Sequence, residues 1–142
     1  MQRSACNTRI AIVLLEIGAV GCEPTFKSQG TLLIQDADFR PISCHVLVED
    51  FGIALQDAPG ARLELSLPPA RLDAWRSVSG VPRARFMPSN NARVLDPGAC
   101  GTLTLTGEGY HGQGKRAVSG QVSLSCSGEV TVRGDFTFSG CF

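Results

Sequence analysis

The sequence predicts an all-β domain: a small antiparallel β-sandwich, or an open barrel, with one short helix and disulfide bridges. Three observations favour this class. Apolar and polar residues alternate along several short segments, as in strands with one buried and one solvated face. The chain contains sixteen glycines and eight prolines, and turns rich in these residues separate the strands of sandwiches and barrels. Six cysteines in 142 residues could brace a small domain.

Residues 1–21 are predicted to be a secretory signal segment. Arg3 and Arg9 give a basic start without acids, and the apolar run over 10–21 is interrupted only by Glu16. A basic start, about 7–15 apolar residues and then small residues form the secretory pattern. The run is too short for a membrane-spanning helix, which needs about 20 apolar residues.

The end of this segment, Ala19-Val20-Gly21-Cys22, resembles the lipobox of bacterial lipoproteins. In that family the cysteine is acylated and becomes the new N-terminus. The resemblance covers the N-terminal segment alone. It implies that Cys22 carries lipid, that residues 22–28 are a tether, and that residues 29–142 form the exported domain. The implied location is extracytoplasmic, in the bacterial cell envelope, either membrane-anchored or secreted.

Four cysteines remain beyond Cys22, and an even number in an exported chain indicates two disulfides. We expect Cys100–Cys126 and Cys44–Cys141. Cys126 is placed at the tip of the last hairpin, and a straight last strand carries Cys141 about 40 Å away from that tip. The alternative, Cys44–Cys126 with Cys100–Cys141, stays open because Cys44 and Cys126 share the inward phase of their strands.

Each strand is expected where the alternation is clear. Residues 61–67 alternate without a fault and place Leu63 and Leu65 inward. One short helix is expected over 69–77, because Pro69 suits a first helical turn and Trp75 could plug an open end of the sandwich. The expected strands cover 29–35, 44–48, 61–67, 83–87, 92–95, 101–106, 119–125 and 130–138.

The register of the last strands also follows from face parity. Facing residues on neighbouring strands must point to the same side of the sheet. A three-residue loop over 126–128, with a glycine at its end, then sets Leu124 opposite Val130. The preceding hairpin is expected to set Leu103 opposite Leu124.

Two short motifs that could suggest chemistry are interpreted as chance. Residues 107–112 match GxGxxG, but phosphate binding also needs a helix after the glycines, and a strand pattern follows instead. We therefore expect no nucleotide. The cell-adhesion tripeptide at 133–135 falls inside a strand and not on a loop tip, so we expect cross-strand roles for its side chains.

No arrangement of residues reaches the level of a catalytic or metal site. Cys44 and His45 are adjacent in a strand and diverge to opposite faces, and the chain contains no GxSxG elbow. We expect no enzyme activity, cofactor or metal. The formal net charge of zero also argues against a nucleic-acid partner, since such proteins usually carry a basic surplus.

One local charge bias remains, in the region 62–93, with six arginines and two acids. Arginines beside an aromatic anchor could bind an anionic ligand, and the candidate residues are Arg71, Trp75, Arg76, Arg83 and Arg85. The main expectation is a non-enzymatic structural or interaction module on a membrane surface, with an envelope protein, an anionic glycan or lipid as possible partners. The alternative is a ligand-binding module that uses this arginine-rich region.

Overall fold

The computed structural model describes residues 25–47, 51–68, 77–90, 93–111 and 115–142. Within these ranges the chain forms ten strands and no helix. No segment of the described chain is a helix long and apolar enough to span a bilayer. The strands are β1 (Lys27–Ile34), β2 (Ala37–Phe39), β3 (Pro41–Leu47), β4 (Phe51–Asp57), β5 (Arg62–Leu67), β6 (Ser77–Gly80), β7 (Arg83–Met87), β8 (Thr102–His111), β9 (Lys115–Ser127) and β10 (Thr131–Cys141).

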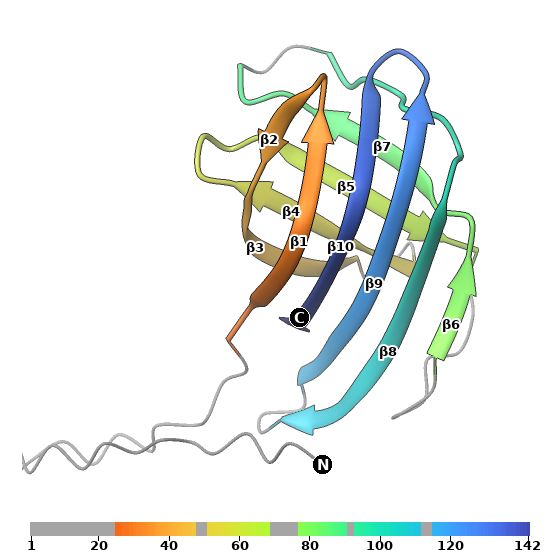
Figure 1. Ribbon diagram of the computed structural model, residues 1–142. Coiled ribbons are helices and arrows are strands. Elements are labelled where there is room, and N and C mark those ends of the chain that lie inside the picture. Colours follow the sequence, from red (N-terminus) through yellow and green to blue (C-terminus); the bar gives the residue numbers. More distant parts are fainter. Residues whose placement is uncertain (1–24, 48–50, 69–76, 91–92, 112–114) are drawn as a thin grey trace, which may run out of the picture.

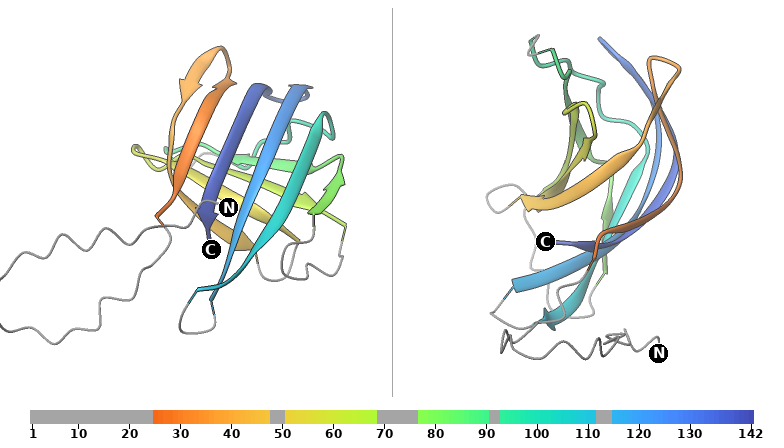
Figure 2. Two further views of the ribbon diagram at one scale, coloured as in Figure 1. Left: turned by 60° about the horizontal axis from the view of Figure 1, so that its bottom comes forward. Right: turned by 90° about the vertical axis from the view of Figure 1, so that its left-hand side faces the viewer.

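These strands form two antiparallel sheets that face each other. The large sheet has the order β2-β1-β10-β9-β8-β6, and the small sheet has the order β3-β4-β5-β7. Figure 1 shows the large sheet in front with the strands of the small sheet crossing behind it, and the right-hand view of Figure 2 shows the two layers from the side. The prediction of an all-β, antiparallel, disulfide-braced chain is confirmed.

The core lies between the sheets and is built from alternate residues of their strands. In β5, Leu63 and Leu65 are fully buried while Arg62 and Glu64 face outward, which confirms the alternation expected there. β7 and β10 repeat this alternation, whereas β4 is buried continuously from Gly52 to Leu55. The central core residues are Leu32, Ile53, Leu55, Leu63, Leu65, Leu103, Leu105, Val118, Val122, Val130 and Val132.

The short helix expected over 69–77 is not seen. Residues 69–76, and Trp75 among them, lie outside the described residues. Ser77 is not helical: it opens β6 and pairs with Thr106 of β8. Helical spacing could not anticipate this, because the pairing is a long-range contact that overrides local preference.

The register of the last hairpin differs from the prediction, because its loop lies two residues further along the chain than expected. The loop does contain three residues, but they are 128–130, so that Cys126 lies within β9 and pairs with Val132. Leu124 consequently faces Gly134 instead of Val130. The preceding hairpin is also displaced, since Leu103 faces Val122 and not Leu124.

The displaced register has a physical reason at the other end of the hairpin. A slip of an even number of residues, four in the last hairpin and two in the preceding one, leaves every inward side chain inward, so the alternation pattern cannot exclude it. In the observed register Phe138 faces Gly120. A Cβ atom at Gly120 would lie 2.6 Å from the Phe138 ring, so the ring occupies the space that a larger residue would fill.

Both expected disulfides are present. Cys44 of β3 is bonded to Cys141 of β10, with 5.0 Å between their Cα atoms, and this bond links the small sheet to the large one. Cys100 is bonded to Cys126, with 5.2 Å between their Cα atoms. The alternative pairing, Cys44–Cys126 with Cys100–Cys141, does not occur.

Candidate functional site

The structure places three arginines of the basic region on one surface, the outer face of the small sheet. Arg62 belongs to β5, and Arg83 and Arg85 belong to β7. We call these three residues the arginine face. Arg71, Trp75 and Arg76 lie outside the described residues.

Two of the three guanidinium groups are already engaged by one carboxylate. Glu64 lies between them: its Oε1 is 3.0 Å from Nη2 of Arg62, and its Oε2 is 3.7 Å from Nη1 of Arg85. The Glu64 side chain is only 17% exposed, whereas that of Arg85 is 55% exposed. An anionic ligand would therefore compete with Glu64 for Arg62 and Arg85. Arg83 faces Ser66 across the β5–β7 pair.

The remaining described arginine of this region does not join the arginine face. Arg93 forms an ion pair with Glu129, with 2.6 Å between Nη2 and Oε2. The Glu129 amide donates to the carbonyl oxygen of Asp96 at 2.9 Å. Arg93, in the connection that precedes β8, thus links that connection to Glu129 of the β9–β10 loop.

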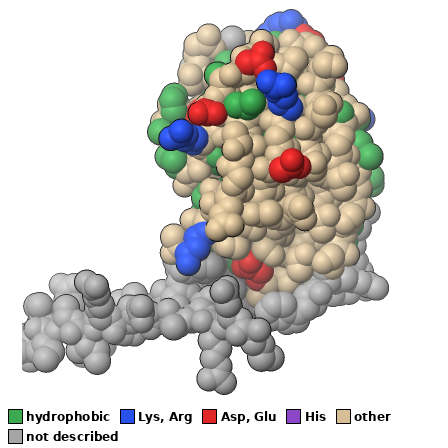
Figure 3. Space-filling model, viewed as in Figure 1, with side chains coloured by type: hydrophobic (Ala, Val, Ile, Leu, Met, Phe, Trp, Pro, Cys, Tyr) green, Lys and Arg blue, Asp and Glu red, His purple; other side chains and the backbone are tan. Residues whose placement is uncertain are grey.

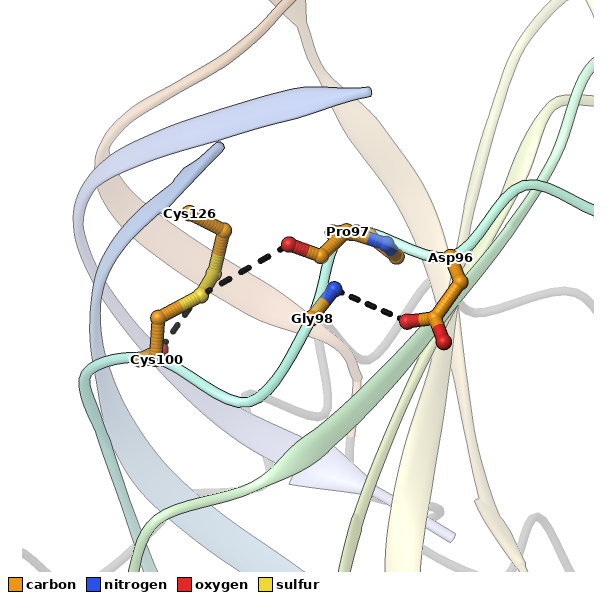
Figure 4. The surroundings of a disulfide bond; sticks show 5 residues. All are labelled: Asp96, Pro97, Gly98, Cys100 and Cys126. Carbon is orange, nitrogen blue, oxygen red and sulfur yellow. Dashed lines mark hydrogen bonds between the residues drawn. A yellow bond between two sulfur atoms is a disulfide. The ribbon is translucent and has the colours of Figure 1, made fainter. Parts of the chain in front are cut away.

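That connection is fixed at its end by the disulfide shown in Figure 4. The Gly98 amide donates to Oδ1 of Asp96 at 2.8 Å. The Cys126 sulfur lies 3.3 Å from the carbonyl oxygen of Cys100, and the Cys100 sulfur lies 4.0 Å from that of Pro97. These are packing contacts, because disulfide sulfurs carry no hydrogen to donate. The disulfide therefore ties the connection before β8 to β9.

The adhesion-type tripeptide lies within β10, as expected, and its charged side chains have partners on neighbouring segments. Arg133 Nη2 is 2.9 Å from Oδ1 of Asp36 in the β1–β2 turn. The Ser123 hydroxyl donates to Oδ1 of Asp135 at 2.6 Å, and these two residues face each other in the β9–β10 pair. Both contacts lie across strands, so the tripeptide is part of the sheet surface.

The glycine motif at 107–112 also has the expected context of a hairpin. Gly107 lies in β8, which continues to His111, and β9 begins at Lys115. His111 pairs with Lys115. Strand and not helix therefore follows the glycines, which is the wrong setting for a phosphate held at a helix N-terminus.

The outer face of the large sheet carries an ordered set of uncharged polar side chains. Register places Ser79, Thr104, Gln121, Thr137 and Gln29 side by side across β6, β8, β9, β10 and β1. We call these five residues the polar row. Figure 3 shows this face, on which uncharged tan atoms predominate and charged side chains are few.

Two hydrogen-bonded pairs of hydroxyl groups lie at one edge of this face, between β6 and β8. The Ser79 and Thr104 hydroxyl oxygens are 2.7 Å apart, and those of Ser77 and Thr106 are also 2.7 Å apart. The strand predicted over 101–106 corresponds to the first part of β8. β6 was not predicted, because its short segment carries no clear alternation and is positioned by its pairing with β8.

Comparison of the chain with protein-family models, curated proteins and solved structures finds no match.

Proposed function

We propose that this chain is an exported, lipid-anchored protein of the bacterial cell envelope, with a β-sandwich that acts as a non-enzymatic interaction module. The lipobox-like segment ending at Cys22 supports the anchor. The two disulfides are consistent with an extracytoplasmic location, because such bonds persist in oxidising compartments.

The observation that carries the interaction role is the polar row. Apolar side chains fill the space between the sheets, so a partner is expected to use an outer face. Hydroxyl and amide groups both donate and accept hydrogen bonds, and strands present such groups about 4.8 Å apart. The polar row therefore favours an extended, uncharged, hydrogen-bonding partner in the envelope.

The anchor is tested by metabolic labelling with a fatty-acid analogue. The wild-type chain should be labelled and should fractionate with membranes, whereas Cys22→Ser should lose both properties. Equal labelling of the two proteins, or no labelling of either, would contradict the anchor.

The interaction surface is tested by co-sedimentation of the purified domain with isolated envelope fragments. The double variant Gln29→Glu/Gln121→Glu keeps the side-chain shapes of the polar row but replaces amide donors by charged acceptors. We expect binding to weaken about tenfold or more, since each lost hydrogen bond contributes about 0.5–1.5 kcal/mol.

The matched control is Gln56→Glu, the same chemical change at a half-exposed residue of β4 in the small sheet. This variant should bind as the wild type does. The second candidate, an anionic ligand on the arginine face, predicts instead that Arg83→Gln/Arg85→Gln abolishes binding while the polar-row variant does not.

A further inference from the structure

We infer that the lipid-anchored protein stands end-on, with the end of the fold formed by residues 25–28 and 139–142 against the lipid headgroups. We call this end the anchor end. The inference rests on the proposed acylation of Cys22, and it identifies which surface of the domain the membrane covers.

The first step is that the chain is fixed to the fold from Thr25 onward. The Thr25 carbonyl oxygen approaches Gly140 so closely that a Cβ atom there would lie 2.4 Å from it. Phe26 packs against the core, and Lys27 pairs with Ser139. Residues 25–28 therefore belong to the folded domain, although the sequence predicts a tether that extends to residue 28.

The second step is the length of the remaining tether. Only Glu23 and Pro24 separate Cys22 from Thr25. Three Cα–Cα steps of at most about 3.6 Å reach about 11 Å. The polar interface of a bilayer leaflet is itself about 5–8 Å thick. An acylated Cys22 lies at that interface, so Thr25 has to lie within or just above the headgroups.

The third step is the direction of the fold away from the membrane. Figure 1 shows that β1 starts at the end of the molecule where β10 finishes, while the β1–β2 turn lies at the opposite end. From Lys27 to Asp36, β1 and its turn extend about 30 Å at about 3.3 Å per residue. The β9–β10 loop also lies at this distant end, since Gln35 donates its amide to the carbonyl oxygen of Thr131.

Lys27 is exposed at the anchor end, where a cation is attracted to anionic headgroups. At the distant end the carboxylates of Asp36 and Glu129 are ion-paired with Arg133 and Arg93, so the direction rests on the tether and not on a difference in charge between the two ends. End-on standing also leaves the polar row on the side of the domain, accessible to an envelope partner.

The test measures the distance of two introduced tryptophans from the headgroups in the full, lipidated protein. Trp75→Phe first removes the single native tryptophan, and Ser28→Trp or Thr131→Trp then reports the anchor end or the distant end. Both positions are exposed. The proteins are reconstituted into phosphatidylcholine vesicles that contain a lipid with a nitroxide on its headgroup, which quenches nearby fluorescence.

We expect strong quenching at residue 28 and little at residue 131. Equal quenching at both positions, stronger quenching at 131, or none at either would overturn the end-on arrangement. A third variant, with ten Gly/Ser residues inserted after Pro24, should lose most of the quenching at 28. If it does not, the short tether is not what holds the anchor end at the membrane.

Fatty-acid labelling of the same preparations separates this inference from the proposed function. A chain that is not labelled at Cys22 overturns the anchor and the orientation together. A labelled chain with the wrong quenching pattern overturns the orientation alone. The circular dichroism and non-reducing mass of each variant show that it has kept its fold and both disulfides.

Discussion

Replacement of Gln35 by glycine should stabilise the protein, because the β1–β2 turn holds two non-glycine residues in the left-handed region. Gln35 has φ 54° and Asp36 has φ 60°. Positive φ at both central residues is the requirement of a type I′ hairpin turn, which strongly prefers glycine or asparagine. Gln35→Gly keeps the backbone amide that donates to Thr131.

The expected gain follows from two opposing terms. A left-handed conformation costs a residue with a Cβ atom roughly 1–2 kcal/mol relative to glycine. Glycine in turn adds about 0.4–1 kcal/mol of chain entropy to the unfolded state. The net stabilisation of Gln35→Gly is therefore about 0.5–1 kcal/mol. With a urea m-value of about 2 kcal/mol/M, the midpoint of unfolding should rise by about 0.3–0.5 M.

Asp36→Gly is the matched control in the same turn. It relieves less strain, because aspartate tolerates the left-handed region better than most residues, and it removes the ion pair with Arg133. That pair is solvent-exposed, with side-chain exposures of 60% and 77%, so it contributes only about 0–1 kcal/mol. The net change should lie near zero. A lower urea midpoint for Gln35→Gly than for the wild type would refute the reasoning.

The remaining predictions concern the disulfides and one strand glycine. The Cys44–Cys141 bond spans 97 residues, so the chain-entropy account predicts that Cys44→Ala/Cys141→Ala lowers the free energy of unfolding by about 4–5 kcal/mol. The Cys100–Cys126 bond spans 26 residues, and its removal in Cys100→Ala/Cys126→Ala should lower that free energy by about 3–4 kcal/mol. Urea unfolding measures both, and the reverse order would contradict that account. Gly134→Ala should cost about 2–4 kcal/mol, because its φ is 141° and the new Cβ atom would lie 2.0 Å from a carbonyl oxygen of β1.

The control for Gly134 is Gly98→Ala. Gly98 has φ 93°, but no atom lies within 4 Å of its virtual Cβ position. This variant isolates backbone strain, so it should cost only about 1–2 kcal/mol. Equal losses of stability at the two positions would show that the close approach of β1 at Gly134 does not add to the cost of the substitution.

A strand with one buried face could be predicted from the sequence, whereas a strand buried on both faces could not. The alternation of β5 identifies it within one residue. In β4, by contrast, Gly52, Ile53, Ala54 and Leu55 are consecutively buried, so no alternation exists. A short apolar run of this kind does not distinguish a strand from a helix by periodicity.

The arginine face and the polar row could be predicted from the sequence only in part. The alternation over 61–67 correctly places Arg62 on an outward position. Its charge environment depends on which strand lies beside β5, and the neighbours prove to be β4 and β7. Only that order brings Arg85 opposite Glu64. The polar row likewise needs five strands in register, which no local pattern encodes.

The pairing of β1 with β10 and the Cys44–Cys141 bond have a consequence for the order of events during synthesis. A chain made from its N-terminus presents β1 and Cys44 long before their partners, since Cys141 follows Cys44 by 97 residues. Cys100 and Cys126 emerge earlier, so Cys44 can be oxidised with either of them first. Reaching the native bonds then requires thiol–disulfide exchange. A yield of natively bonded protein during synthesis that depends on a disulfide isomerase would be the signature of this delayed closure.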